Sequence, residues 1–299
     1  MKTIYLAGKM SGVEKWNFPA FDRNRDFLKD CGWNVISPAD LDRAIGFDEN
    51  DPDVVFTEQD FHLAMKRDYE AILKSDAIAF MPGWENSTGA KLERDFAGKL
   101  GLTMYRVDAD KEYLEREMII GLCGFAQVGK DCLAKELVSR FGFERRAFAD
   151  TLRNVLYELN PIIYGDGPGN VERVKDLVDA WGYERAKIEH PEIRALLQRL
   201  GTEAGRKYIA EDIWSRVVFE NAHGPRLVIP DVRFPNEAKA IQDRGGIIVR
   251  ITREGYTPIN AHVSEIAYTD QDYILVNDGS PEDLYKKFLE KVIVPLGWN

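Results

Sequence analysis

The segment Met118-Ile-Ile-Gly-Leu-Cys-Gly-Phe-Ala-Gln-Val-Gly-Lys-Asp131 joins a short apolar run to a glycine-rich turn. Apolar residues then recur on one helix face at Leu133, Leu137, Val138 and Phe141. These patterns predict a strand over 118–123 and a helix over 130–141. The spacing GxxxxGK lets backbone N–H groups surround phosphate oxygens, with Lys130 reaching the outer phosphates of a nucleoside triphosphate. The segment therefore predicts a phosphate-binding loop, the alternative being a glycine-rich turn with a chance lysine.

This loop supplies the first set of candidate site residues. They are Gly124, Phe125, Ala126, Gln127, Val128, Gly129, Lys130, Asp131 and Cys132. Asp131 stands where a Ser or Thr hydroxyl ordinarily contacts Mg²⁺, so the metal must be held by this carboxylate, through water, or elsewhere. Asp131 is the candidate Mg²⁺ ligand, and we expect a nucleoside triphosphate and Mg²⁺ at this loop.

A second polar cluster follows another apolar strand. The run Leu227-Val-Ile-Pro-Asp231-Val-Arg233 ends in an acid and a base, at the sheet edge where α/β proteins bind ligands. We predict that Asp231 positions Mg²⁺ or a nucleophilic phosphate; the alternative is a cap for the helix predicted from Pro235. Lys130 and Asp231 are the candidate catalytic residues of this half.

Arginines are the candidate phosphate clamps, because a planar guanidinium offers two donors to a phosphate. Arg153, Arg233 and Arg253 are the candidates. Gln198 and Thr202 lie four residues apart on one predicted helix face, a spacing suited to hydrogen bonding a base or sugar edge. Trp214 is predicted to belong to the core.

The 299 residues form two series of strand-like runs and helical stripes. This alternation predicts an α/β protein with a doubly wound, flavodoxin- or Rossmann-like parallel sheet over 1–107, a charged linker over 108–117 and a second α/β domain over 118–299. The first series contains strands over 3–7, 33–36, 76–81 and 102–107 and helices over 17–31, 57–74 and 88–100. The second continues with several helices to about 221, strands over 226–231, 247–253 and 273–277, a helix over 235–244 and a final helix capped by Ser280-Pro-Glu-Asp283.

Composition excludes several classes of protein. Forty basic against fifty acidic side chains give a net charge of −10, which argues against stable nucleic-acid binding. Three cysteines without a CxxC pair argue against a disulfide framework and against zinc. No run reaches the ~18 apolar residues of a membrane span. We expect a homo-oligomer in the cytoplasm.

Residues 118–299 resemble the bacteriophage deoxynucleoside monophosphate kinases. The resemblance rests on the loop and on downstream motifs: Leu196-Leu-Gln-Arg-Leu-Gly-Thr-Glu203, Val228-Ile-Pro-Asp-Val-Arg233, His262-Val-Ser-Glu265 and Val276-Asn-Asp-Gly-Ser280. It implies a phosphate-loop nucleotide kinase fold and transfer of the γ-phosphate of ATP to a deoxynucleoside monophosphate. The loop of that family commonly reads GKDT, and Cys132 stands here in place of the threonine.

Two carboxylates lie within apolar stripes of the first half. Asp68 falls among the apolar positions of the helix predicted over 57–74, and Glu93 precedes the buried face of the helix over 88–100. Carboxylates are seldom buried without a partner or a function, so we predict that Asp68 and Glu93 belong to one site. The alternative is that both side chains lie at the edge of their stripes and are exposed to water. Ser87-Thr88-Gly89 opens the second helix as a candidate anion site. A nucleotide there would bring its sugar near Glu93 for attack at the anomeric carbon, with Asp68 managing a proton.

Residues 3–106 are similar to the nucleoside 2-deoxyribosyltransferase and deoxynucleoside 5′-monophosphate N-glycosidase superfamily. The matching pieces are Ile4-Tyr-Leu-Ala-Gly-Lys-Met-Ser-Gly12, Arg67-Asp-Tyr-Glu70, Ser75-Asp-Ala-Ile-Ala79 and Ser87-Thr-Gly-Ala-Lys-Leu-Glu93. The resemblance implies that Tyr5, Asp68 and Glu93 are catalytic and that Gly8 contacts substrate.

Together these patterns predict a deoxynucleotide-metabolism enzyme. Its first domain cleaves or exchanges an N-glycosidic bond, and its second phosphorylates a deoxynucleoside monophosphate. One alternative is a nucleotide-binding regulator without turnover, favoured by Asp131, Cys132 and the absence of a superfamily arginine from Lys9–Gly12. Another is a kinase for a different acceptor, such as a coenzyme precursor.

Overall fold

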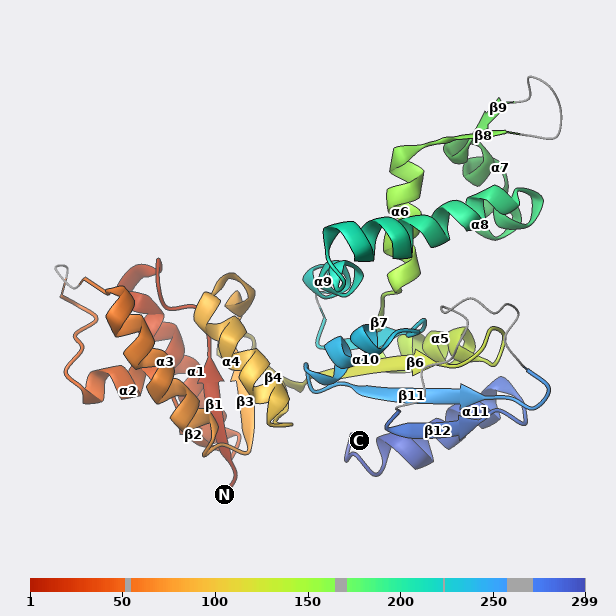
Figure 1. The fold of residues 1–299 in the computed structure, drawn as a ribbon. Helices are drawn as coiled ribbons and strands as arrows, with labels where there is room; N and C mark the ends of the chain where they lie inside the picture. The colour runs from red at the N-terminus through yellow and green to blue at the C-terminus, as the bar shows by residue number, and fades with distance from the viewer. Residues whose placement is uncertain (52–54, 165–170, 223, 257–270, 299) are drawn as a thin grey trace. The chain divides into compact units, whose positions relative to one another are not determined.

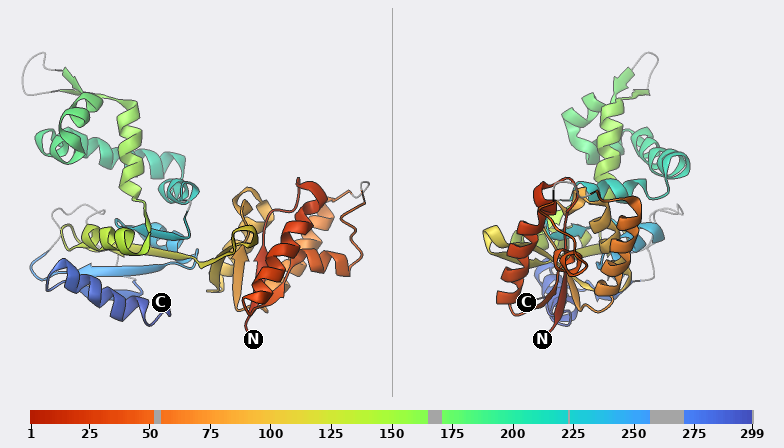
Figure 2. Two further views of the ribbon diagram at one scale, coloured as in Figure 1. Left: turned by 180° about the vertical axis from the view of Figure 1, so that it is seen from behind. Right: turned by 90° about the vertical axis from the view of Figure 1, so that its left-hand side faces the viewer.

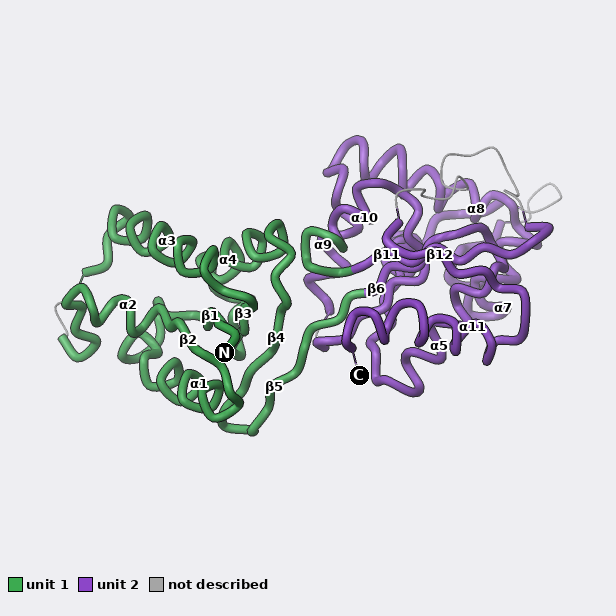
Figure 3. Tube along the Cα trace, turned by 90° about the horizontal axis from the view of Figure 1, so that it is seen from below, with its two compact units in different colours: residues 1–119, 241–246 green, residues 120–240, 247–299 purple. Residues whose placement is uncertain are grey.

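The computed structural model describes residues 1–51, 55–164, 171–222, 224–256 and 271–298. The chain divides into two compact units (Figure 3): the first contains residues 1–119 and 241–246, the second residues 120–240 and 247–299. Each unit is built on a five-stranded sheet, so the protein is an α/β protein with two such sheets. The motif 262–265 and most of the glycine-rich stretch 164–170 lie outside the described residues.

The first unit holds a mixed sheet in the order β2-β1-β3-β4-β5. Its strands are β1 (Thr3–Ala7), β2 (Asn34–Ile36), β3 (Ala77–Phe80), β4 (Thr103–Asp108) and β5 (Tyr113–Arg116). The pairings among β1 to β4 are parallel, and β5 is antiparallel to β4. Order 2-1-3-4-5 is that of flavodoxin-like doubly wound sheets, with an antiparallel edge strand added here.

Helices cover both faces of this sheet (Figure 2) because β1 alternates its apolar side chains. Ile4 and Leu6 pack with α1 on one face, whereas Tyr5 and Ala7 pack with α3 and α4 on the other. The helices are α1 (Phe18–Asp30), α2 (Pro38–Ala44), α3 (Glu58–Ile72) and α4 (Thr88–Lys99).

The segment 108–117 is not an unpaired linker over its whole length, because β5 forms a hairpin with β4. The prediction missed this strand because charged residues dominate the segment. Those charges have partners: Glu117 is 8% exposed, accepts a 2.6 Å hydrogen bond from Arg94 and pairs with Arg106. Both guanidinium groups lie over the Trp84 ring.

The second unit is built around β6, which leads into the phosphate-binding loop. The sheet order is β12-β11-β6-β10-β7. The strands are β6 (Met118–Cys123), β7 (Glu144–Arg145), β10 (Arg226–Ile229), β11 (Ile247–Thr252) and β12 (Tyr273–Val276). The helices α5 (Lys130–Phe141), α10 (Pro235–Gln242) and α11 (Pro281–Phe288) accompany it, and the predicted Ser280–Asp283 cap of α11 is confirmed.

A helical region separates β7 from β10 (Figure 1). It contains α6 (Phe148–Leu159), a hairpin of β8 (Ile162–Tyr164) and β9 (Val171–Arg173), α7 (Val174–Glu189), α8 (Pro191–Gln198), a π-helical continuation (Arg199–Ile209) and α9 (Ile213–Glu220). Within the described parts of the chain, no helix combines the length and hydropathy needed to cross a membrane.

Candidate functional sites

The phosphate-binding loop has a backbone that favours glycine at both ends. Gly124 and Gly129 have φ angles of 132° and 113°, values that L side chains rarely adopt. A Cβ at Gly124 would lie 2.2 Å from the carbonyl oxygen of Ile251 on β11. The loop therefore lies directly against the end of a neighbouring strand.

Lys130 begins α5 and folds back over the loop. Its Nζ donates hydrogen bonds to the carbonyl oxygens of Gly124 at 2.8 Å and Phe125 at 2.6 Å. Burial lowers the pKa of Lys130, and the charge of Arg233 lowers it further. An anion entering the loop would replace these carbonyl contacts and compensate the buried charge.

A cavity of about 310 Å³, here called the loop cavity, opens over the loop. The predicted residues Gly124, Phe125, Ala126, Gln127, Lys130 and Asp131 line it. Val128 is buried beneath it, and Gly129 and Cys132 do not line it. The Asp131 side chain is 75% exposed and lies 3.7 Å from Arg145. Among the described residues, no group of three or more His, Cys, Asp or Glu side chains converges as a metal site.

Asp231 caps a helix, but not the one that the sequence suggested. Its two carboxylate oxygens accept hydrogen bonds from the N–H groups of Phe148 at 3.0 Å and Ala149 at 2.8 Å, at the start of α6. Burial raises its pKa. Glu237 serves the helix near Pro235 instead, accepting from the N–H groups of Arg233 at 2.8 Å and Phe234 at 3.0 Å. Asp231 thus holds the N-terminal end of α6, the helix that carries Arg153.

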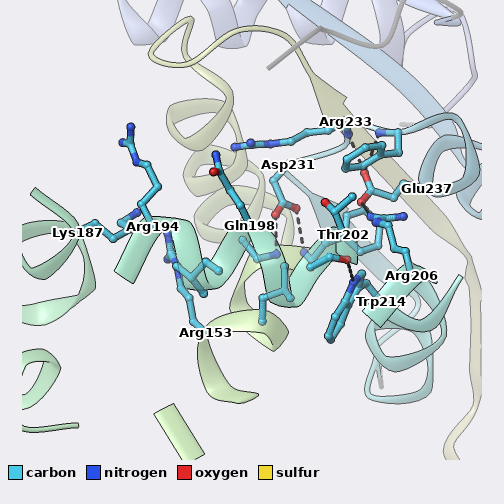
Figure 4. A pocket seen from close by; sticks show the side chains of 16 residues that line it. Arg153, Lys187, Arg194, Gln198, Thr202, Arg206, Trp214, Asp231, Arg233 and Glu237 are labelled. Carbon is cyan, nitrogen blue, oxygen red and sulfur yellow. Dashed lines mark hydrogen bonds and ion pairs between the residues drawn. The ribbon is translucent and has the colours of Figure 1, made fainter. Parts of the chain in front are cut away.

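A second cavity of about 220 Å³ adjoins the loop cavity, and we call it the helical cavity (Figure 4). Five predicted site residues line it: Arg153, Gln198, Thr202, Asp231 and Arg233. Arg153, Asp231 and Arg233 line both cavities and therefore lie where they meet. Predicted triphosphate and acceptor residues are in this way brought to adjoining spaces.

Three cations of the helical cavity were missed by the sequence prediction: Lys187, Arg194 and Arg206. Arg206 forms a 2.5 Å hydrogen-bonded ion pair with Glu237, whose pKa is raised to about 7 by burial. Trp214, predicted as core, is 4% exposed and donates from Nε1 to the Gly201 carbonyl at 2.9 Å.

The structure does not bring Arg253 to the two cavities. It follows β11, lies over the Tyr256 ring at 5.3 Å, and lines neither the loop cavity nor the helical cavity. Its assignment as a phosphate clamp stays a prediction. Of the two strand-end arginines, Arg233 and Arg253, only Arg233 reaches the cavities.

The first unit contains a cavity of about 400 Å³, here called the acidic cavity. Asp68 from α3 and Glu93 from α4 both line it, and the two side chains are 9% and 4% exposed overall. Tyr5 on β1 donates a 2.8 Å hydrogen bond to Glu93 Oε1. The predicted contact residues Gly8, Ser87, Thr88 and Gly89 line the same cavity. The structure therefore gathers every predicted site residue of this unit.

Burial sets the protonation of the two acids. It raises the pKa of Asp68 to about 7 and that of Glu93 to about 8, and the charge of Asp68 contributes to the shift at Glu93. The Tyr5 hydroxyl opposes both shifts, while its own pKa is raised well above 10. Burial and mutual repulsion therefore favour the protonated form in this pair of acids.

The rest of the acidic cavity is aromatic and carries no basic group among the described residues that line it. The aromatic side chains are Trp16, Phe18, Phe47, Phe56 and Phe61. A third acid, Asp42, also lines it and accepts a 2.5 Å hydrogen bond from Arg67. At the helix start, Ser87 Oγ accepts from the Ala90 N–H at 3.3 Å, so one of the free amide donors is already used.

Two families match separate parts of the chain. Residues 173–288 match the family described as deoxynucleotide monophosphate kinase. Residues 2–106 match a family described as a domain of unknown function, DUF4406. This second description does not identify the first unit as a deoxyribosyltransferase or a glycosidase.

Individual relatives agree with the first of these matches. A protein of Acanthamoeba polyphaga mimivirus, named as a candidate deoxynucleotide monophosphate kinase, is 30% identical over 194 residues, covering 58% of this chain and 96% of the relative. Deoxynucleotide monophosphate kinases of Escherichia phage RB69 and Enterobacteria phage T4 are 25% and 26% identical. Those alignments cover 41% and 32% of this chain, and 49% and 43% of the phage proteins.

Proposed function

The chain belongs to the deoxynucleotide monophosphate kinase family, and on this premise we propose that its second unit transfers the γ-phosphate of ATP to a deoxynucleoside monophosphate. The observation that carries the proposal is the adjoining pair of cavities with Arg153 and Arg233 lining both. In this reaction an oxygen of the acceptor phosphate attacks the γ-phosphorus. The bond from that phosphorus to the bridging oxygen breaks, giving ADP and a deoxynucleoside diphosphate.

The residues of the loop cavity fit a triphosphate. The loop and Lys130 provide N–H donors and a partly desolvated cation, and Arg233 adds a second positive charge nearby. Asp131 and Asp150 line the same cavity with carboxylates of the type that binds Mg²⁺. Phosphoryl transfer depends on positioning and charge neutralisation, which these groups supply.

The helical cavity fits the acceptor. Arg153, Arg194 and Arg206 carry guanidinium groups for a monophosphate, while Gln198 and Thr202 offer hydrogen bonds to a base or sugar. A test incubates the protein with MgATP and each deoxynucleoside monophosphate and measures diphosphates by chromatography. Formation of ADP and diphosphate in equal amounts with at least one acceptor is expected. ATP hydrolysis without acceptor phosphorylation, or transfer only to a coenzyme precursor, would contradict the proposal.

For the first unit we propose cleavage or exchange of an N-glycosidic bond. In the reactive state the proton lies on Asp68, and Glu93 is a carboxylate stabilised by the Tyr5 hydrogen bond. Glu93 attacks C1′ of the sugar, the C–N bond breaks, and the departing base takes the proton from Asp68. Water, or a second base, then attacks C1′, releases Glu93 and returns a proton to Asp68. The Tyr5 hydrogen bond holds Glu93 in place for the attack.

The composition of the acidic cavity favours a deoxynucleoside over its 5′-monophosphate as this substrate. The helical cavity contains five basic side chains, whereas no described residue lining the acidic cavity is basic. A buried phosphate without a cation would be costly, while aromatic rings suit a neutral base. A test supplies each deoxynucleoside and each monophosphate separately and measures free base. Base release from neither set would contradict the proposal.

A further inference from the structure

The end of the phosphate-binding loop is held by a residue that is distant in sequence. Asn277, which follows β12, donates from Nδ2 to the Val128 carbonyl oxygen at 2.8 Å. Val128 and Asn277 are 0% and 6% exposed, so water does not compete effectively for this bond. A Cβ at Gly129 would lie 2.7 Å from the same Nδ2. The side-chain amide therefore packs directly on the loop backbone.

Asn277 is itself rigidly placed. Its N–H donates to the carbonyl of Thr252 at 2.8 Å, at the end of β11. The following turn is tied to α11, because Ser280 and Asp283 form a capping box and Lys287 pairs with Asp278. Lys287 also donates to the Val276 carbonyl at 3.2 Å. The amide is thus presented to the loop from a turn fixed on both sides.

The two ends of the loop are held by neighbouring strands, since Gly124 lies against Ile251 and Gly129 against Asn277. The direction of the Val128 carbonyl fixes the peptide plane that contains the Gly129 N–H. We propose that Asn277 is a positioning residue for the triphosphate donor, because it anchors the loop backbone immediately before Lys130, which lines the loop cavity. The proposal rests on the proposed kinase function of the second unit.

Asn277→Asp is the most informative variant. Asn277 Oδ1 has no hydrogen-bond partner in the described structure, so among the side-chain hydrogen bonds the substitution changes only the one that Nδ2 makes. The substitution is isosteric and replaces a donor to Val128 by an acceptor. Removing a donor from a buried carbonyl costs about 1–3 kcal/mol, so we expect the KM for MgATP to rise about tenfold or more. The KM for the deoxynucleoside monophosphate should stay within about twofold.

Asn221→Asp is the matched control, since Asn221 also donates to a carbonyl, that of Val217 at 2.8 Å, but is exposed at the end of α9. Its kinetics should equal those of the wild type. Asn277→Ala is a second variant, and titration with a non-hydrolysable ATP analogue should show the same weakening in the folded protein. A merely structural role would lower the active fraction and kcat with KM unchanged, and that result, or failure of both variants to fold, would overturn the proposal. Absence of kinase activity in the wild type would instead reject the proposed function.

Discussion

The Tyr5 hydroxyl on β1 donates a 2.8 Å hydrogen bond to Glu93 Oε1 on α4, and both side chains are buried. The bond joins the first strand of the chain to the helix that follows β3. It stabilises the Glu93 carboxylate in surroundings where burial favours the protonated form. The nucleophilic role proposed for Glu93 therefore depends on Tyr5.

Tyr5→Phe removes this hydrogen bond, and we expect base release to fall about 10- to 100-fold. Kinase activity should be unchanged. Tyr113→Phe is the matched control, because Tyr113 donates to Glu115 in the same unit but away from the acidic cavity. Chromatographic measurement of free base decides the point, and equal losses in the two variants would count against the role of Tyr5.

Glu93→Gln should stabilise the protein relative to the wild type, and this difference should increase as pH rises. Because burial raises the pKa of Glu93 from 4.5 to about 8, folding favours its protonated form, and stability declines as pH increases through that interval. The amide cannot ionise, so the Tm gain over wild type should grow from pH 5 to pH 9, by roughly 2 to 4 °C per kcal/mol. Glu14→Gln, at an exposed position, should show no such trend. A constant Tm difference across this range would contradict the buried-acid assignment.

Lys130→Ala and Glu93→Ala should separate the two activities. The lysine variant is expected to lose phosphoryl transfer by about 100-fold or more while base release stays intact. The glutamate variant should lose base release and retain phosphoryl transfer. Both reactions are followed in one chromatogram, with circular dichroism to verify folding. Equal loss of both activities in each folded variant would refute independent sites.

Asp231→Asn should weaken both folding and catalysis. An amide accepts through only one oxygen, so one of the N–H groups of Phe148 and Ala149 would lose its partner, at about 1–3 kcal/mol. Urea denaturation should show this loss, and kcat should fall because α6 carries Arg153. Asp176→Asn, at an exposed position of α7, is the control. Unchanged stability would show that the cap is dispensable.

Arg153→Ala and Arg253→Ala test which of the predicted phosphate clamps contributes to acceptor binding. Arg153 lines both cavities, so its loss should raise the KM for the acceptor about tenfold or more. Arg253 lines neither, and its variant should remain close to wild type. Steady-state kinetics with varied acceptor distinguishes them, and a larger effect at Arg253 would reverse the assignment.

The strands and helices with strong periodicity were predictable from sequence, whereas short or charged elements were not. The strand over Thr3–Ala7 and the helix over Lys130–Phe141 occur with the bounds expected. Helix α2 is too short to show a periodic stripe, β7 has two residues, and the charges of β5 conceal its pairing with β4. Their formation depends on partners that are distant in sequence or on neighbouring elements.

The acidic cavity was predictable because carboxylates within apolar stripes are unusual. The helical cavity was predicted in part: Gln198 and Thr202 were identified, but Arg194 and Arg206 were missed. These four side chains follow each other at intervals of four residues, and all line the cavity. Extending the spacing by one step in each direction would have found both arginines. Lys187 lies on a different helix, and no local spacing marks it.

Because Arg153, Lys187, Arg194 and Arg233 line both the loop cavity and the helical cavity, the two ligands proposed for the second unit would share counter-charge. Occupancy of one space alters the electrostatic cost of filling the other. Thermodynamic linkage makes this effect reciprocal. If the first ligand changes the affinity for the second by some factor, the second changes the affinity for the first by the same factor. The order in which the two ligands bind is consequently a property of these four cationic side chains as much as of either cavity.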